Sequence, residues 1–390
     1  MNKFLVYVIA LGAFLVGAAE LVVSGVVSAI AGDLGVSLAL AGQLVTAFSL
    51  SFAIGTPFLI ALTSRWTRKK VLAGAIAVYI IGSLVAVASF NYETLIVSRI
   101  ILGASAGVYT VVAISSAAKL VSPNRIGAAI GTIAFGFSAA MALGVPLGVA
   151  IADWWGWRAI FLVLGALSLV ILFILLRLLP QIEGDAQASF RSQLTVLRNP
   201  AISSGLLISL MACVSNAVLL TYIAPFLTDI LHMNNVALGG IMLMLGVFGA
   251  LGSRIGGYGA DKWGAGQMIV GSLVLTALTL AFVPVFTMAP IVVLVLLALW
   301  MSSVFMTAPA LNMYFIQQSP RSSNFVLSIN LSIIHLGISL GAGAGGAAVN
   351  AIDTVLYHPW FASGAALLGL AAAALSLSLR RKRSSRPVAQ

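Results

Sequence analysis

Long apolar runs follow one another from the beginning of this sequence to its end, and they constrain the fold more than any other feature. Each is about 18 residues or longer, enough to cross the roughly 30 Å hydrocarbon core of a bilayer. Of the 390 residues 61% are hydrophobic and only 7% are charged. Because no water hydrogen-bonds the backbone at that depth, a spanning chain forms helices or a closed barrel. A barrel would show alternating segments of about ten residues, which this sequence lacks. It therefore predicts an all-α integral membrane protein.

Polar breaks divide the apolar runs into twelve expected transmembrane helices. Their expected bounds are 4–31, 41–63, 71–90, 93–119, 126–152, 158–179, 201–228, 236–259, 266–288, 290–317, 323–350 and 356–380. Lysine and arginine gather in alternate loops, whereas the loops between these carry acids and a single base, Arg158. Since cytoplasmic loops are the ones enriched in Lys and Arg, we expect both termini in the cytoplasm and the chain in the plasma (inner) membrane.

The first apolar run begins like a signal peptide, with Lys3 before an apolar stretch and small residues at Ala18 and Ala19. It continues past Glu20 to about Ala31, which is too long for the apolar core of a signal peptide. We therefore expect an uncleaved first helix.

A polar interruption after the sixth helix, "PQIEGDAQASFRSQLTVLRNP", divides the chain into two similar halves. "TSRW" (63–66) matches "ADKW" (260–263), and "LGVPLG" (143–148) matches "LGAGAG" (340–345) at the same offset. Both pairs fall at equivalent places, which indicates a duplicated six-helix bundle. The expected domains are an N-terminal six-helix bundle (1–179), a cytoplasmic linker (180–200), a C-terminal six-helix bundle (201–380) and a basic cytoplasmic tail (381–390).

Several classes of function lack the residues they need. Cys213 is the only cysteine, so no internal disulfide or thiolate metal site is expected. The three histidines show no ligand spacing. "GAGAGG" (341–346) lies inside an apolar helix, whereas a dinucleotide site needs a preceding strand. We attribute the net charge of +11 to loops at anionic lipid head groups, not to nucleic-acid binding. With no Walker motif and no reactive cluster, we expect no enzyme, no cofactor and no metal.

Glu20 lies near the middle of the first helix, at a depth where a carboxyl group is unfavourable in the hydrocarbon core of the bilayer. Acids at this depth nearly always face the bundle interior or a water-filled cavity, because a lipid-facing charge costs several kcal/mol. Burial favours the neutral form of the acid, which brings proton exchange towards neutral pH. We predict that Glu20 carries the proton; the alternative is a hydrogen-bonded structural Glu that never titrates.

Several motifs make the whole chain resemble the major facilitator superfamily, and within it the drug:proton antiporter branch. "GTPFLIALTSRWTRKKVL" resembles the superfamily's G-x-x-x-D-R-x-G-R-K signature after the second helix. The matching residues are Gly55, Arg65, Arg68 and Lys69. Ser64 and Thr67 stand where the family usually has Asp and Gly, whereas the second copy, "GGYGADKWG", keeps the acid as Asp261. The resemblance implies a cytoplasmic latch; the alternative is that these are only basic cytoplasmic loops.

Two further motifs carry the resemblance. "IVSRIILGASAG" (96–107) resembles the fourth-helix motif, which implies that Arg99 is the electrostatic partner of Glu20, since the first and fourth helices are neighbours in that fold. A snorkelling arginine is the alternative. "ALGVPLG" (142–148) resembles the fifth-helix motif of antiporters. Gly144 and Gly148 permit close helix approach and Pro146 removes a helical hydrogen bond. We therefore expect a gating joint here, with a packing kink as the alternative.

The resemblance implies a secondary transporter that exports a small molecule and takes up protons by alternating access, with the proton gradient as its energy source. "AGQLVTAFSL", "GFSAAMALGVPLG" and "YIAPFLTDILHM" are most similar to purine base and nucleoside efflux pumps. Sugar, chloramphenicol and multidrug exporters, or a proton-coupled importer, are alternatives.

The expected partners are a small-molecule substrate, protons and membrane lipids, and the chain is expected to be a monomer. Candidate substrate-binding residues, each of which could instead form an interhelical hydrogen bond or an interfacial contact, are Gln43, Tyr109, Asn216, Tyr222, Trp300, Asn312, Asn330 and His335.

Overall fold

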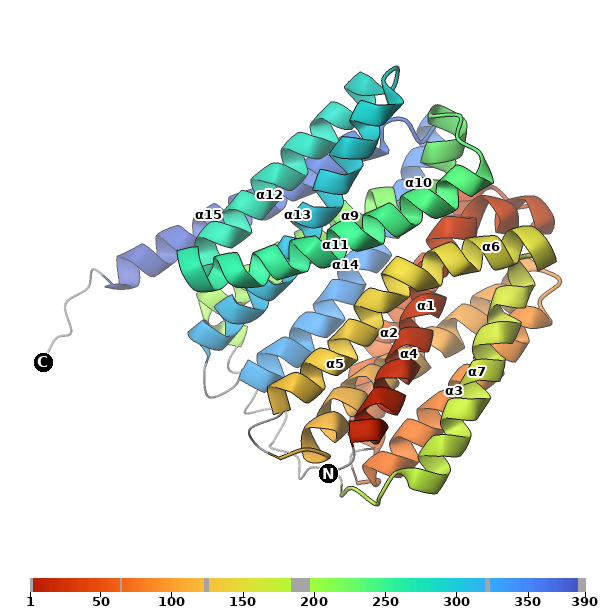
Figure 1. Cartoon of the computed structure of the whole chain (residues 1–390). Coiled ribbons are helices and arrows are strands. Elements are labelled where there is room, and N and C mark those ends of the chain that lie inside the picture. The colour runs from red at the N-terminus through yellow and green to blue at the C-terminus, as the bar shows by residue number, and fades with distance from the viewer. Residues whose placement is uncertain (1–2, 64, 123–125, 184–196, 320–322, 385–390) are drawn as a thin grey trace, which may run out of the picture. The chain divides into compact units, whose positions relative to one another are not determined.

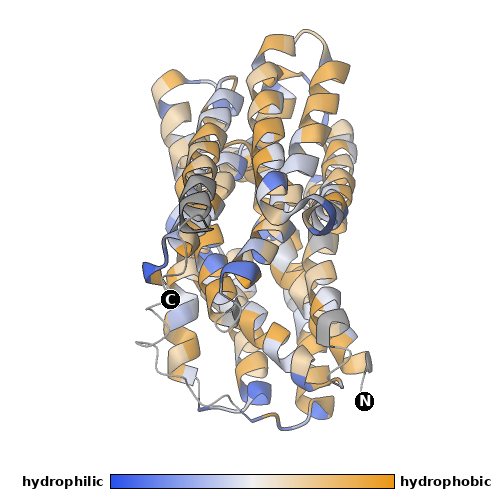
Figure 2. Cartoon of the chain, turned by 90° about the vertical axis from the view of Figure 1, so that its left-hand side faces the viewer, coloured by the Kyte–Doolittle hydropathy of each residue, from blue (hydrophilic) through white to orange (hydrophobic). Residues whose placement is uncertain are grey.

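A computed structural model (Figure 1) describes residues 3–63, 65–122, 126–183, 197–319 and 323–384. All regular structure in these ranges is helical, and they contain twelve helices long and apolar enough to cross a membrane. Apolar residues dominate these helices (Figure 2). The predicted all-α membrane fold with twelve spans is confirmed.

Most spans begin and end within a few residues of their predicted bounds, whereas the seventh helix, predicted to reach 228, ends at Leu220. The elements are α1 (Lys3–Leu34), α2 (Leu38–Thr63), α3 (Arg68–Val87), α4 (Tyr92–Lys119), α5 (Ile126–Ala139), η2 (Ala140–Gly144), α6 (Val145–Trp155), α7 (Trp157–Leu178), α9 (Pro200–Leu220), α10 (Ile223–Pro225), η4 (Phe226–Ile230), α11 (Asn235–Trp263), α12 (Ala265–Phe282), η5 (Val283–Phe286), α13 (Pro290–Gln318), α14 (Ser323–Ile352) and α15 (His358–Ser384).

Two of the predicted helices are irregular beside a proline. In the fifth, the π-helical turn η2 separates α5 from α6, and Pro146 lies in the first turn of α6, where its missing N–H costs no helical bond. In the seventh, α9 ends at Leu220, and Pro225 lies in the short α10 before the π-helical turn η4. Proline cannot donate to the preceding turn, so the regular pattern does not continue past Leu220.

The chain divides into two compact units. Unit 1 comprises residues 1–186, 220–246 and 342–355, and unit 2 comprises residues 187–219, 247–341 and 356–390. The helices α11 and α14 therefore belong partly to each unit. The predicted domain bounds at 179 and 201 stay a prediction, and much of the predicted linker and of the tail lies outside the described residues.

Each unit has its own packing. In unit 1, α1 packs against α2, α4, α5 and α7. In unit 2, α12 packs against α13 and α15, and hydroxyl pairs join α12 to α13: Ser272 with Thr307 at 2.8 Å and Thr276 with Ser303 at 2.7 Å. Such side chains hold membrane helices together by hydrogen bonds that lipid cannot provide.

Candidate functional site

Arg99 lies on α4 and is completely enclosed in unit 1. Its Nη1 donates to the main-chain oxygen of Ala19 on α1 at 2.8 Å, and its Nε donates to that of Leu44 on α2 at 3.2 Å. The guanidinium group lies 4.4 Å from the centre of the Phe48 ring, within the range of a cation–π contact. One arginine thus joins three helices through hydrogen bonds and a stacked ring.

Glu20 follows Ala19 on α1 and is partly buried. Glu20 and Arg99 interact electrostatically, so unit 1 brings together the two residues that the sequence paired. The Arg99 side chain is enclosed among helices and bonds to α1 and α2, an arrangement that favours the pairing over the snorkelling alternative. A role of the pair in proton coupling stays a prediction.

Two tyrosines hold the same helix by its backbone. The hydroxyl of Tyr79 on α3 donates to the main-chain oxygen of Leu15, and that of Tyr109 on α4 donates to that of Ile9, both at 2.9 Å. With Arg99, three buried side chains therefore donate to carbonyls of α1 and fix its rotation. The sequence placed Tyr109 among substrate contacts, and the structure gives it this interhelical bond. Tyr79 was missed, although a tyrosine inside an apolar run is a signal for such a partner.

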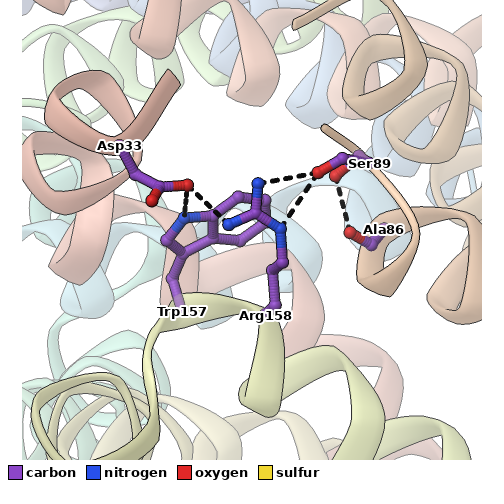
Figure 3. Close-up of polar contacts among 5 residues, drawn as sticks. All are labelled: Asp33, Ala86, Ser89, Trp157 and Arg158. Carbon is purple, nitrogen blue, oxygen red and sulfur yellow. Dashed lines mark hydrogen bonds and ion pairs between the residues drawn. The ribbon is translucent and has the colours of Figure 1, made fainter. Parts of the chain in front are cut away.

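A polar cluster joins the end of α1 to the start of α7 (Figure 3). Arg158 forms an ion pair with Asp33 and donates to the main-chain oxygen of Ser89 from Nε at 3.0 Å and from Nη2 at 2.8 Å. The indole Nε1 of Trp157 donates to Asp33 at 3.1 Å, and the Ser89 hydroxyl donates to Ala86. In the sequence, Arg158 stands out only as the single base of its set of loops, and Asp33 as one of the acids there. The signal that could have found the cluster is "DWWGWRAIF", where tryptophan precedes a lone base.

The predicted joint in the fifth helix meets α1 at very short range. A methyl group placed on Gly144 would lie 2.9 Å from the Cβ of Ala18, and one placed on Gly148 would lie 2.1 Å from Cγ2 of Val22. The π-helical turn η2 lies directly before Pro146. The close approach and the irregular helix are therefore present where the sequence placed them, and their part in gating stays a prediction.

Two candidate substrate residues, Gln43 on α2 and Tyr222 between α9 and α10, lie close together in unit 1. A methyl group on Gly346 would lie 2.8 Å from Nε2 of Gln43 and 2.7 Å from the hydroxyl of Tyr222. The Tyr222 hydroxyl also donates to the main-chain oxygen of Ala342 at 3.1 Å.

The other candidate substrate residues lie in unit 2. Trp300 on α13 and Asn330 on α14 are buried, as is His335 on α14, whereas Asn216 on α9 is half-buried and Asn312 on α13 is exposed. Within the described residues, Nε1 of Trp300 and the Oδ1 atoms of Asn216 and Asn330 are buried and make no hydrogen bond. Buried polar atoms are nearly always satisfied, so these three call for a partner such as water or a bound solute.

The residues of the predicted cytoplasmic latch are described only in part, and the latch itself stays a prediction. A methyl group placed on Gly55 would lie 3.4 Å from the Cβ of Ala104 on α4, and the backbone N–H of Arg68 donates to the main-chain oxygen of Ile182 at 2.8 Å. Arg65 and Asp261 are exposed and belong to different units. Ser64 lies outside the described residues.

Comparison with known proteins identifies the family. The model of the Major Facilitator Superfamily matches residues 9–342. The uncharacterised MFS-type transporter YbcL of Bacillus subtilis (strain 168) is 34% identical over 389 residues, which cover 100% of both chains. The inner membrane transport protein YdhP of Escherichia coli (strain K12) is 28% identical over 374 residues, 96% of this chain and 95% of the relative.

Solved structures show the same fold. A D-xylose–proton symporter superposes with a TM-score of 0.80 at 17% identity, covering 95% of this chain and 96% of the other. A bacterial homolog of the human lysosomal transporter Spinster superposes with a TM-score of 0.79 at 16% identity, covering 97% and 98%. The chain belongs to the Major Facilitator Superfamily. It is a multi-pass membrane transporter and not an enzyme.

Proposed function

We propose that this transporter is a proton-coupled antiporter that exports a small organic molecule, with Glu20 as the proton carrier. The observation that carries the proposal is the pairing of Glu20 with Arg99 among the membrane-spanning helices of unit 1. Ionisable residues at this depth are costly and mark ion or substrate pathways.

The surroundings of Arg99 support a reversible proton on Glu20. Arg99 is held by Ala19, Leu44 and Phe48, so its position does not depend on the charge of Glu20. The carboxyl group can then lose or regain a proton while its positive partner stays in place. A pair held only by its own attraction would separate when the acid became neutral.

Two features support export with both termini in the cytoplasm. The alternation of basic and acidic loops follows the positive-inside rule. "LGVPLG" resembles the antiporter motif, and the helix is irregular there, with η2 directly before Pro146. A proton-coupled importer of the same fold is the alternative, and the flux experiment below separates the two.

The substrate class we propose is a neutral, planar molecule with hydrogen-bonding edges, such as a purine base or nucleoside. Arg99 is the only Lys, Arg, Asp or Glu among the fully buried residues of the described chain. Its Nε and Nη1 already donate to backbone oxygens, and its Nη2 makes no hydrogen bond within the described residues. Amides and aromatic rings prevail among the candidate contacts, and rings of this kind stack on planar solutes. Sugars, chloramphenicol and multidrug substrates are the alternatives.

Flux in proteoliposomes with an imposed pH gradient tests the coupling. We expect the wild-type chain to move substrate against its gradient, and Glu20→Gln to lose this while retaining exchange without a gradient. Glu93→Gln is the matched control, because Glu93 is an exposed acid in the first turn of α4. If Glu20→Gln still moves substrate uphill at the wild-type rate, Glu20 is not the proton carrier. If substrate moves in the same direction as the protons, the protein is an importer and not an exporter.

A thermal-shift screen of the purified protein tests the substrate class separately. Purine bases, nucleosides, sugars and chloramphenicol are compared at equal concentration. Stabilisation by purines or nucleosides supports the proposal, and stabilisation only by a sugar or chloramphenicol contradicts it.

A further inference from the structure

Tyr222 occupies an unusual place in unit 1. The helix α9 ends at Leu220, and Tyr222 has the non-helical angles φ −111 and ψ 21. Its side chain is completely enclosed, and its hydroxyl donates to the main-chain oxygen of Ala342 on α14 at 3.1 Å. The break in the helix therefore turns the ring inward, onto another helix.

Glycines form the slot that receives the hydroxyl end of this ring. A methyl group on Gly42 of α2 would lie 1.9 Å from the Tyr222 hydroxyl oxygen and 2.4 Å from Cζ. A methyl group on Gly346 of α14 would lie 2.7 Å from the same oxygen. Real Cβ contacts are essentially never below 3.0 Å, so a larger residue at either position forces the hydroxyl end of the ring to shift from its present place.

The slot lies where two separate segments join the N-terminal helices. The segments 220–246 and 342–355 both belong to unit 1, and Tyr222 and Ala342 lie near the first residue of each. Gln43 closes the same slot, since its Nε2 would lie 2.8 Å from a methyl group on Gly346. A single ring thus contacts α2 and α14 and holds both segments to the N-terminal helices.

We propose that Tyr222 is the bolt of a gate, and that Gly42 and Gly346 form the socket. With the ring in the socket, the end of the protein at which α2 begins is closed. Withdrawal of the ring opens this end, so the socket must stay free of side-chain atoms for closure to occur. The gate reassigns Tyr222 from a substrate contact to a moving part, and it does not depend on the substrate or on proton coupling.

A buried reporter cysteine measures whether this end is closed. The background carries Cys213→Ser, which removes the only cysteine, and Ser24→Cys. Ser24 is buried on α1 and lines a small apolar cavity with Leu220 and Met242. It lies ten residues before the end of α1, about 15 Å along the helix, whereas Gly42 lies only about 6 Å from the start of α2. A membrane-impermeant maleimide must therefore pass the gate to reach it.

The rate at which the maleimide labels the reporter cysteine is measured in intact cells and in inverted membrane vesicles, which expose opposite sides of the membrane. We expect slow labelling of the reporter in the otherwise unchanged chain. Gly42→Ala and Gly346→Ala should each increase the rate by roughly tenfold, the change that corresponds to about 1.4 kcal/mol against the closed state. Gly32→Ala is the matched control, because a methyl group there meets open space on α1, and it should not change the rate.

Two further variants separate the gate from a general loosening of the helices. Once Tyr222→Ala removes the ring, Gly42→Ala should add no further labelling, since the clash has disappeared. Tyr222→Phe keeps the ring and removes the hydrogen bond to Ala342, so it should raise labelling even if the glycine variants fail to fold. Unchanged labelling in Tyr222→Phe, an equal rise in Gly32→Ala, or additive effects of Gly42→Ala and Tyr222→Ala would each overturn the proposal.

Discussion

Replacement of Gly103 by alanine tests how tightly the Arg99 site depends on the packing beside it. Gly103 lies on α4 one turn after Arg99, where a methyl group would lie 2.2 Å from the main-chain oxygen of Phe48 and 3.0 Å from its Cα. These are backbone atoms, which cannot relieve the clash by a change of rotamer as a flexible side chain can. The helices α2 and α4 must therefore separate by about 1 Å to reach normal contact distance.

The expected change in the free energy of unfolding combines one stabilising and two destabilising contributions. Alanine is a better helix former than glycine, which stabilises the variant by about 0.5–1 kcal/mol. Overpacking of a close interface costs about 1–3 kcal/mol. Separation of the helices also breaks the bond from Arg99 to Leu44, already 3.2 Å long, and the loss of a hydrogen bond to a charged group costs about 1.5–3 kcal/mol. Gly103→Ala should therefore lower the free energy of unfolding by roughly 2–5 kcal/mol.

Reversible unfolding of the detergent-solubilised protein, titrated with SDS and followed by tryptophan fluorescence, measures this change. Gly74→Ala on α3 is the control, because a methyl group there meets nothing within 4 Å. The control should be as stable as the wild-type chain or more stable by about 0.5–1 kcal/mol. If Gly103→Ala proves as stable as Gly74→Ala, the backbone contact between α2 and α4 does not hold the Arg99 site in place.

Three further changes address the joint, the buried arginine and the polar cluster of Figure 3. Pro146→Ala should change the transport rate or the proton leak much more than substrate affinity, and a large loss of affinity with normal coupling in binding and flux assays would place Pro146 in the binding site. Arg99→Lys should insert normally and lose about 1.5–3 kcal/mol of stability in the SDS titration, because one ammonium group cannot reproduce the planar fork; wild-type stability would contradict this. Asp33→Asn should lower the melting temperature measured in detergent and remove its sensitivity to salt, since the ion pair with Arg158 is partly exposed and salt screens it; an unchanged salt dependence would show that the pair contributes nothing.

The number of helices and their positions could be predicted from the sequence because hydropathy alone sets them. Only long apolar runs satisfy both the lipid and the backbone, so the spans appear without knowledge of packing. The proximity of Glu20 and Arg99 was also predictable, although through a family resemblance and not through local pattern.

Contacts of the backbone were not predictable in the same way. The hydroxyl of Tyr79 and the guanidinium group of Arg99 donate to main-chain oxygens. Every residue carries such an oxygen, so the acceptor residues cannot be identified from their side chains. The gate could not be predicted for the same reason, since the small size of Gly42 and Gly346 is required only because the Tyr222 ring lies against them. Asp33 and Arg158 were visible as charges, but their partnership depends on how two distant helix ends meet.

The order of the helices also bears on how the buried arginine enters the membrane. Both acceptors of Arg99, on Ala19 and Leu44, belong to helices that precede α4 in the chain, and a chain is synthesised from its N-terminus. Arg99 lies about two turns inside α4, and an arginine in an inserting helix is costly, by about 2.5–3.5 kcal/mol at the helix centre. During synthesis α1 and α2 are therefore already available when α4 leaves the ribosome. A circular permutant that places α1 and α2 after α15 must insert Arg99 before its acceptors exist.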